Sequence, residues 1–181
     1  LEVFSDVPIK ELREDKLTEL DLSRKGLGPA EGFVIAKLVA VTSVLTECNV
    51  RGFILDSESA HSLAKGATEK RIMLFGIKHD QTEANFTRQG LSTVDAILIA
   101  SDLRVTAVLT SLDLSGNRLC GVWWNQGEES TSNVVELGKY DSSGIDALAN
   151  ALMTNSVLRS LNLNGDSKDP YSGIRSEGAK A

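Results

Sequence analysis

The feature that most constrains how this chain can fold is a leucine pattern that recurs about every 28 residues. In its clearest copy, Leu109, Leu112, Leu114, Asn117 and Leu119 follow the spacing Leu-x-x-Leu-x-Leu-x-x-Asn-x-Leu. Apolar residues fit the same frame in four other segments, residues 17–27, 45–55, 72–77 and 158–163. Because a repeated unit of this size buries its apolar face only against its neighbours, the pattern predicts a stack of similar units.

The intervals between copies predict where the stack is interrupted. The first three copies begin at Leu17, Leu45 and Ile72, so they follow one another at 28 and 27 residues. The next two begin at Leu109 and Leu158, after 37 and 49 residues. Since insertions within repeats fall in loops, we expect inserted loops at residues 79–90 and 120–143.

Each copy predicts a short strand, and the segments between copies predict helices. Leu112 and Leu114 alternate with Asp113, so the leucines point inward and the aspartate outward. The side-chain amide of Asn117 can then bond to the backbone of neighbouring turns. Between the copies, apolar residues follow the helical i, i+3, i+4, i+7 spacing, in residues 35–42, 60–67, 94–101 and 145–152. Helix starts are indicated by Pro29 and by the capping-box pairs Ser92 with Asp95 and Ser143 with Asp146.

Strand–helix units of this length resemble the ribonuclease-inhibitor type of leucine-rich repeat, which also occurs in NOD-like receptors and Ran GTPase-activating proteins. Residues 144–152 followed by 158–163 are the most similar to that subclass, and the resemblance covers most of residues 9–181. It implies an α/β solenoid of about five strands with two loop insertions, in which a curved parallel sheet lines the concave face. Fold resemblance alone does not fix a function, because one fold hosts many functions.

Composition and charge exclude several classes of partner and location. A net charge of −6 argues against nucleic-acid binding, which needs clustered Lys and Arg. No apolar run approaches the ~20 residues of a membrane span. The two cysteines, Cys48 and Cys120, form no disulfide framework, so we expect a reducing, cytoplasmic location. No obvious polar cap closes the C-terminal end, so we expect residues 1–181 to be one domain that belongs to a longer array or to an assembly.

The sequence shows no pattern that predicts catalysis, a metal or a cofactor. His61 and His79 belong to different repeats and have no metal-ligand spacing, and no phosphate-binding loop is present. No pair of carboxylates stands out as an acid and base couple. We therefore expect no enzymatic activity, no cofactor, no metal and no small-molecule substrate.

The outward positions of the predicted strands are the candidate binding residues, because repeat proteins usually recognise partners on their concave surface. The alternation places eleven residues there, namely Glu19, Asp21, Glu47, Asn49, Arg51, Leu74, Lys78, Ser111, Asp113, Ser160 and Asn162. A second candidate is the adjacent pair Trp123 and Trp124 in the longer insertion, since Trp is enriched where proteins contact partners. The alternative is that these two rings pack against the repeats, because Trp is usually substantially buried.

Three functions are compatible with this sequence. The first is a protein-interaction module that binds a protein partner on its concave face. The second is a structural subunit of a large intracellular assembly. The third, by analogy with Ran GTPase-activating proteins, is GTPase activation through an exposed arginine such as Arg24, Arg51 or Arg118, although no feature around them selects one.

Overall fold

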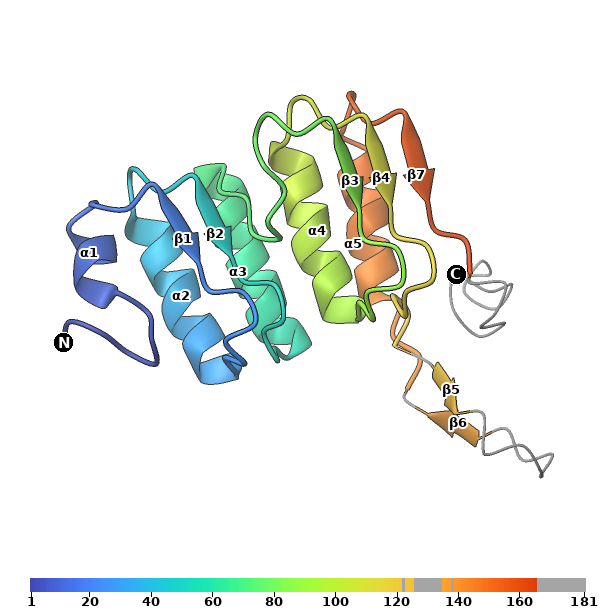
Figure 1. Ribbon diagram of the computed structural model, residues 1–181, viewed down its shortest axis with the longest axis horizontal. Coiled ribbons are helices and arrows are strands. Elements are labelled where there is room, and N and C mark those ends of the chain that lie inside the picture. Colours follow the sequence, from blue (N-terminus) through green and yellow to red (C-terminus); the bar gives the residue numbers. More distant parts are fainter. Residues whose placement is uncertain (122, 126–134, 138, 166–181) are drawn as a thin grey trace.

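The computed structural model describes residues 1–121, 123–125, 135–137 and 139–165, which form a mixed α/β structure (Figure 1). The helices of this part are α1 (Ile9–Arg13), α2 (Pro29–Val41), α3 (Ser57–Lys70), α4 (Thr93–Val105) and α5 (Ser143–Leu152). Its strands are β1 (Glu19–Asp21), β2 (Glu47–Asn49), β3 (Glu83–Asn85), β4 (Ser111–Asp113), β5 (Trp123–Asn125), β6 (Val135–Leu137) and β7 (Ser160–Asn162).

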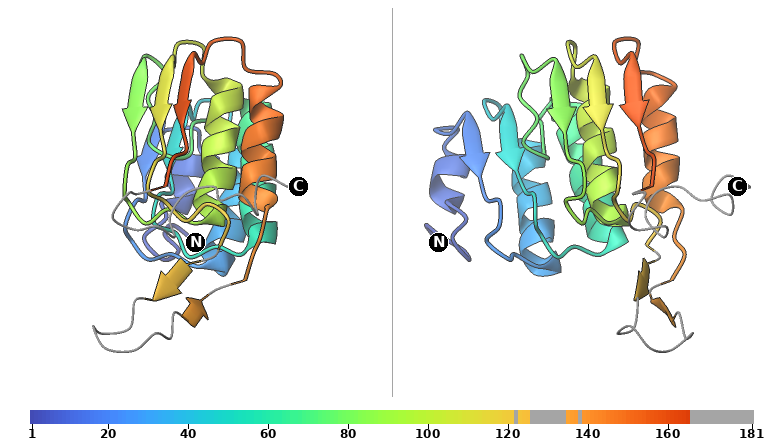
Figure 2. Two further views of the ribbon diagram at one scale, coloured as in Figure 1. Left: turned by 90° about the vertical axis from the view of Figure 1, so that its right-hand side faces the viewer. Right: turned by 45° about the vertical axis from the view of Figure 1, so that its right-hand side comes forward.

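The parallel strands form two small sheets that lie on one side of a layer of helices (Figure 2). β1 pairs with β2 in the first sheet, and β4 lies between β3 and β7 in the second. The register follows the repeat, because Glu19 pairs with Glu47 and Glu83 pairs with Ser111. Ser111 pairs with Ser160 across the longer interval. Within each sheet, a polar strand residue therefore lies beside the matching residue of the neighbouring strand.

The helices form where the apolar spacing and the capping residues predict them. α2 begins at Pro29, and Ser92 and Asp95 form a capping box at the start of α4. The pair Ser143 and Asp146 was predicted wrongly, because Ser143 is already the first residue of α5. The hydroxyl of the preceding Ser142 bonds instead to Asp146 at 2.9 Å, so the serine that precedes the helix takes the partner.

A single hydrophobic core fills the space between the strands and the helices. Leu22, Ile35, Leu63, Ile99 and Leu112 are all at most 1% exposed and belong to one continuous cluster. This cluster includes residues from both sheets, so the interruption between the sheets does not divide the interior. Burial of this apolar surface is the main favourable contribution to folding.

The buried side chain of Asn117 joins its own turn to the turn of the preceding unit, as the leucine pattern predicts. Its Nδ2 donates to the carbonyl oxygens of Phe86 and Leu114, both at 2.8 Å. Its Oδ1 accepts the backbone N–H groups of Gln89 and Leu91, both at 3.0 Å. These bonds satisfy backbone groups that would otherwise be buried without partners.

The third copy of the repeat does not take the predicted register. Met73 makes a single parallel bridge to Glu47, and the backbone N–H of Val50 donates to Leu74 O at 2.9 Å. Leu74 therefore lies level with inward-facing Cys48 and is fully buried, so its assignment to the outward face was wrong. The reason is that residues 72–75 are four consecutive apolar residues, which show no alternation from which a register could be read.

Residues 79–90 are not only an inserted loop, because they contain strand β3. Ala84 pairs with Leu112, and it precedes Leu112 in the chain by one repeat of 28 residues. Ala84, Phe86 and Leu91 are buried, like Leu112, Leu114 and Leu119 in the next unit. The short irregular connection is instead residues 75–82, between the bridge at Met73 and strand β3.

The longer insertion, residues 120–143, also contains regular structure. β5 pairs with β6 in an antiparallel ladder that places Trp124 opposite Glu136, and the pair of strands extends away from the helices and sheets (Figure 1). Residues 122, 126–134 and 138 lie outside the described part. The described part of the insertion therefore contains an antiparallel pair of strands and is not only a loop.

Candidate functional site

The parallel strands present a polar surface, here called the strand face, on the side opposite the helices. In each parallel strand the middle residue is at least as buried as the residues on either side of it, and those two neighbours are polar. The predicted residues Glu19, Asp21, Glu47, Asn49, Ser111, Asp113, Ser160 and Asn162 all occupy these flanking positions. The structure thus brings eight of the eleven predicted residues onto one face, where strand-start residues and strand-end residues form two rows in each sheet.

Strand β3 adds two residues to the strand face that the sequence analysis missed. Glu83 and Asn85 are both exposed and lie beside Ser111 and Asp113. They were missed because their segment was assigned to an insertion. The 28-residue interval from β4 back to β3 was the signal that could have located them.

The last residue of every parallel strand has a structural role that the sequence analysis also missed. Each is Asp or Asn, and its side-chain oxygen accepts the backbone N–H two residues later, at 2.8–3.2 Å, in Asp21, Asn49, Asn85, Asp113 and Asn162. Such turns redirect the chain after a strand. These five residues therefore shape the strand face, and the residues at the start of each strand are freer to contact a partner.

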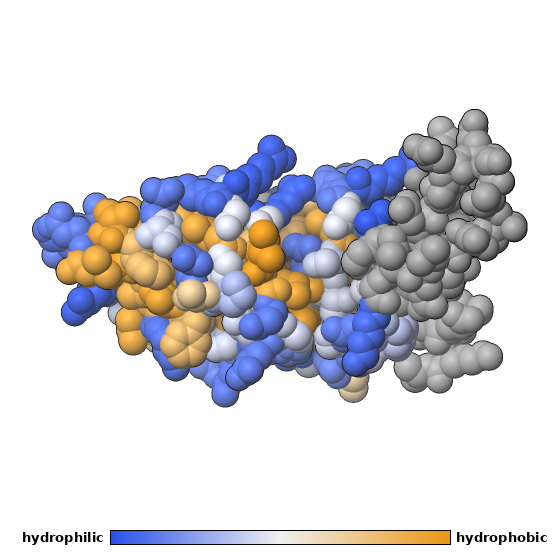
Figure 3. Space-filling view, turned by 90° about the horizontal axis from the view of Figure 1, so that it is seen from below, coloured by the Kyte–Doolittle hydropathy of each residue, from blue (hydrophilic) through white to orange (hydrophobic). Residues whose placement is uncertain are grey.

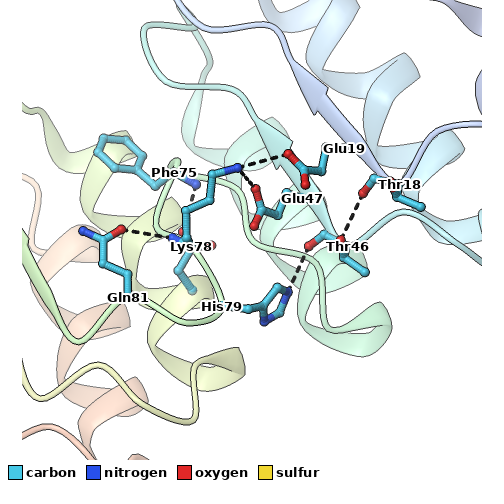
Figure 4. A network of polar contacts seen from close by, with 9 residues as sticks. Thr18, Glu19, Thr46, Glu47, Phe75, Lys78, His79 and Gln81 are labelled. Carbon is cyan, nitrogen blue, oxygen red and sulfur yellow. Dashed lines mark hydrogen bonds and ion pairs between the residues drawn. The ribbon is translucent and has the colours of Figure 1, made fainter.

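Lys78 joins two strands through their glutamates (Figure 4). Its Nζ lies 3.2 Å from Glu19 Oε2 and also contacts Glu47 Oε2. The bond to Glu47 is the main cause that raises the pKa of Lys78. The Lys78 side chain is about half exposed, so the ion pairs orient these groups more than they stabilise the fold.

A hollow of about 110 Å³ lies at this point of the strand face. Glu19, Asp21 and Glu47 contribute carboxylates to its lining, Lys78 contributes the one ammonium group, and Asn49 contributes an amide. Bonds from the hydroxyl and backbone of Ser23 lower the pKa of Asp21, so that carboxylate is charged at neutral pH. The hollow therefore carries an excess of negative charge.

Arg51 occupies the interval between the two sheets and is committed to contacts within the protein. Its guanidinium carbon lies 5.8 Å from the ring centre of Phe75 and 5.4 Å from that of Phe86. It also donates to the side-chain oxygen of Gln89. Arg51 thus links residues near both sheets, and its predicted role as a contact residue for a partner stays a prediction.

The remaining predicted features can be placed as follows. Trp123 and Trp124 lie in β5, but their side chains fall outside what the structure describes.

Within the described residues no group of three or more His, Cys, Asp or Glu could hold a metal ion. Among the helices of that same part, none is both long and apolar enough to cross a membrane. Cys48 is fully buried, which raises the pKa of its thiol to about 12.

The chain matches no protein-family model, and no curated protein matches it in sequence. Its function is therefore inferred from the chemistry of its own surface.

Proposed function

We propose that the protein is a short leucine-rich repeat solenoid that binds another protein on its strand face and has no enzymatic activity of its own. The observation that carries this proposal is the set of polar residues that flank the more buried centre of each parallel strand in both sheets. Hydrophobic packing explains the inward residues but not the outward ones. A regular polar row on a rigid scaffold suits recognition of an extended protein surface.

The hollow at Glu19 and Glu47 indicates the chemistry of the partner. Three carboxylates line it against one lysine, so it favours an approaching Lys or Arg side chain. The guanidinium of an arginine could bond both glutamates in a fork, with Lys78 displaced toward solvent. We therefore propose that the partner presents a basic side chain to this hollow.

The test compares two double variants that change charge equally. Glu19→Gln with Glu47→Gln removes the carboxylates of the hollow, whereas Glu11→Gln with Glu58→Gln removes two exposed carboxylates on α1 and α3. A photo-crosslinking residue at Glu83, on the strand face, captures the partner from the native source. The captured partner is then purified, and its affinity is measured by calorimetry.

We expect the first variant to weaken binding at least tenfold and the second to leave it unchanged. Crosslinking at Glu83 should succeed, and crosslinking at Glu58 should not. If both double variants bind alike, or if only the Glu58 position crosslinks, the strand face is not the binding surface.

A structural subunit of a large assembly is the second candidate, favoured by exposed apolar residues on a different surface. Phe33, at the start of the second turn of α2, is 54% exposed, and Ile54, between β2 and α3, is 71% exposed. Both segments are at the end of the molecule where strands finish and helices begin. Viewed from that side, hydrophobic surface is visible in Figure 3. Exposed apolar patches commonly mark protein contacts.

This second candidate predicts self-association or co-assembly through that surface. Sedimentation velocity of the protein and of the Phe33→Ser, Ile54→Ser variant distinguishes the cases. A concentration-dependent larger species that disappears in the variant favours the assembly. A monomer at all concentrations for both proteins leaves no evidence of self-assembly and favours the first proposal.

GTPase activation has the least support of the three hypotheses. An activating arginine must reach a nucleotide on another protein. The Arg51 guanidinium is held over two phenylalanine rings and by Gln89. Nothing in the sequence around Arg24 or Arg118 selects either of them as a catalytic residue.

A further inference from the structure

A groove of about 340 Å³ lies between α3 and α4, on the helix layer and apart from the strand face. Its volume is within the range of pockets that hold small organic molecules, about 300–1,000 Å³. One side of the groove is formed by residues spaced along α3, and the other by Ile97, Ala100, Ser101 and Arg104 of α4, at the i, i+3, i+4, i+7 spacing. These two helices form most of the groove, and α5 contributes Ala147 to its lining.

Small and apolar side chains make the space between the helices. Ala64 of α3, Ala100 of α4 and Ala147 of α5 line the groove together with Ile97. Larger residues at the three alanine positions would fill it. The lining can accommodate the apolar body of a ligand without burying polar protein groups.

Ser101 gives an independent indication that something polar belongs in this groove. The residue lines the groove and is only 3% exposed, and its hydroxyl oxygen has no hydrogen-bond partner among the described residues. Buried polar side chains are almost always hydrogen-bonded, so an unpartnered one requires an explanation. A hydroxyl rotates about a single bond, so it can turn to meet a ligand oxygen.

The charged groups at the groove have an excess of positive charge. Lys65 of α3 and Arg104 of α4 both line it, and Glu69 is the one carboxylate of the lining. A second carboxylate, Asp141, interacts electrostatically with His61 of the lining. Neither cation forms an ion pair within the part of the chain that the structure describes. His61 also lines the groove and uses its Nδ1 on Ser57 O at 2.7 Å, which leaves Nε2 available.

We propose that this groove binds a small organic acid. The carboxylate of the ligand lies between Lys65 and Arg104, and its apolar body lies against Ile97, Ala100 and Ala147. The hydroxyl of Ser101 turns to bond a ligand oxygen. This site is independent of the protein partner on the strand face, because none of its residues lies in a strand.

The experiment is an NMR titration of the ¹⁵N-labelled protein with 2-naphthoate, an aromatic carboxylate. Its neutral counterpart 2-naphthamide has the same ring system and no charge. We expect 2-naphthoate to shift selectively the amide signals of α3, α4 and the part of α5 around Ala147. The dissociation constant should be on the order of 1 mM for so small a ligand. The amide should bind at least fivefold more weakly.

Three variants locate the site. Lys65→Gln with Arg104→Gln should weaken 2-naphthoate binding at least tenfold, whereas Lys70→Gln, on the same helix but outside the groove, should leave it unchanged. Ser101→Ala should weaken binding several-fold without lowering the melting temperature, since it removes an unpartnered hydroxyl. A Ser101 that served only the fold would change stability and leave the affinity unaltered.

The proposal is overturned if the carboxylate and the amide bind equally, or if the shifted signals lie outside the three helices that line the groove, α3, α4 and α5. Unchanged affinity in the Lys65, Arg104 variant has the same consequence. An acidic peptide that binds the groove where 2-naphthoate does not would also overturn it, because the ligand would then be a protein segment.

Discussion

At the scale of single residues, Asp102 has the most unusual environment. Its carboxylate, fully buried in α4, accepts the backbone N–H groups of Leu74 at 2.6 Å and Phe75 at 2.9 Å. It thereby fixes the segment at which the first sheet ends. Burial raises the pKa of Asp102 to about 7, although the two backbone bonds act in the opposite direction. In the unfolded chain the same carboxyl titrates near 3.8.

This difference predicts a pH-dependent stability. Between about pH 4 and 7 the folded protein holds a proton on Asp102 that the unfolded chain has released. The contribution of Asp102 to the free energy of unfolding is therefore fully present at low pH. It decreases as pH rises through this window, by about 1.4 kcal/mol per pH unit.

Asp102→Asn should remove this contribution to the slope. Urea unfolding of the wild type and of the variant is measured at intervals from about pH 5 to 7.5. The free energy of unfolding of the wild type minus that of the variant should decrease as pH rises. Substitution of the exposed Asp80 by Asn serves as the control. The free energy of unfolding of this variant should change with pH in the same way as that of the wild type. Parallel curves for Asp102→Asn would show that the buried carboxyl does not titrate in this range.

At the scale of elements, two glycines test how closely the helices pack. A Cβ at Gly144, in the first turn of α5, would lie 2.7 Å from Thr93 O and 3.0 Å from Leu119 O. Both are backbone oxygens, so neither can move away unless its segment of the chain moves with it. A Cβ at Gly66, inside α3, would have Ala36 O as its nearest neighbour at 3.6 Å, an ordinary contact.

The two alanine substitutions should therefore have opposite effects. Gly144→Ala should destabilise the protein by about 1–3 kcal/mol through overpacking of α5 on α4. Gly66→Ala should stabilise it by up to about 1 kcal/mol, because alanine favours the helix and fits the space. Urea unfolding of both variants at one pH gives the comparison. If both substitutions change the free energy of unfolding in the same direction, α4 and α5 are not packed as closely as described.

The elements also show what the sequence could and could not predict. The helices from α2 to α5 and the strands β1, β2, β4 and β7 lie where periodicity and spacing predict them, because each contains a clear apolar alternation or stripe. The register at Leu74 failed where four apolar residues follow one another. β3 was missed because its inward residue is Ala84, a weak apolar signal, and because its Asn117 equivalent is Gln89.

The candidate site was predictable to a similar extent. Alternation predicts which residues face outward, so the glutamates and serines of the strand face could be named from sequence. The hollow could not be predicted, because it depends on Lys78 reaching across from an irregular segment to Glu19 and Glu47. The role of Arg51 depends in the same way on Phe86, 35 positions later in the sequence.

At the scale of the whole molecule, the sheet is interrupted while the core and the helix layer are continuous. Phe75, near the end of the first sheet, packs edge-to-face on Phe86, which follows β3, with ring centres 5.3 Å apart. Arg51 covers both rings. These contacts and the bonds of Asp102 couple the two halves, so we expect the described part of the protein to unfold as one cooperative unit.

Hydrogen exchange of two buried amides tests this expectation. Ile35 in α2 and Ile99 in α4 lie in different halves, and both side chains are fully buried. In one cooperative unit their amides should exchange with the same free energy of opening. Arg51→Ala should lower both values equally, by about 1 kcal/mol, since its contacts join the halves. Arg13→Ala, exposed on α1, should change neither. If the two amides differ, or if the Arg51 substitution lowers only one of them, the interruption of the sheet separates two independently unfolding halves.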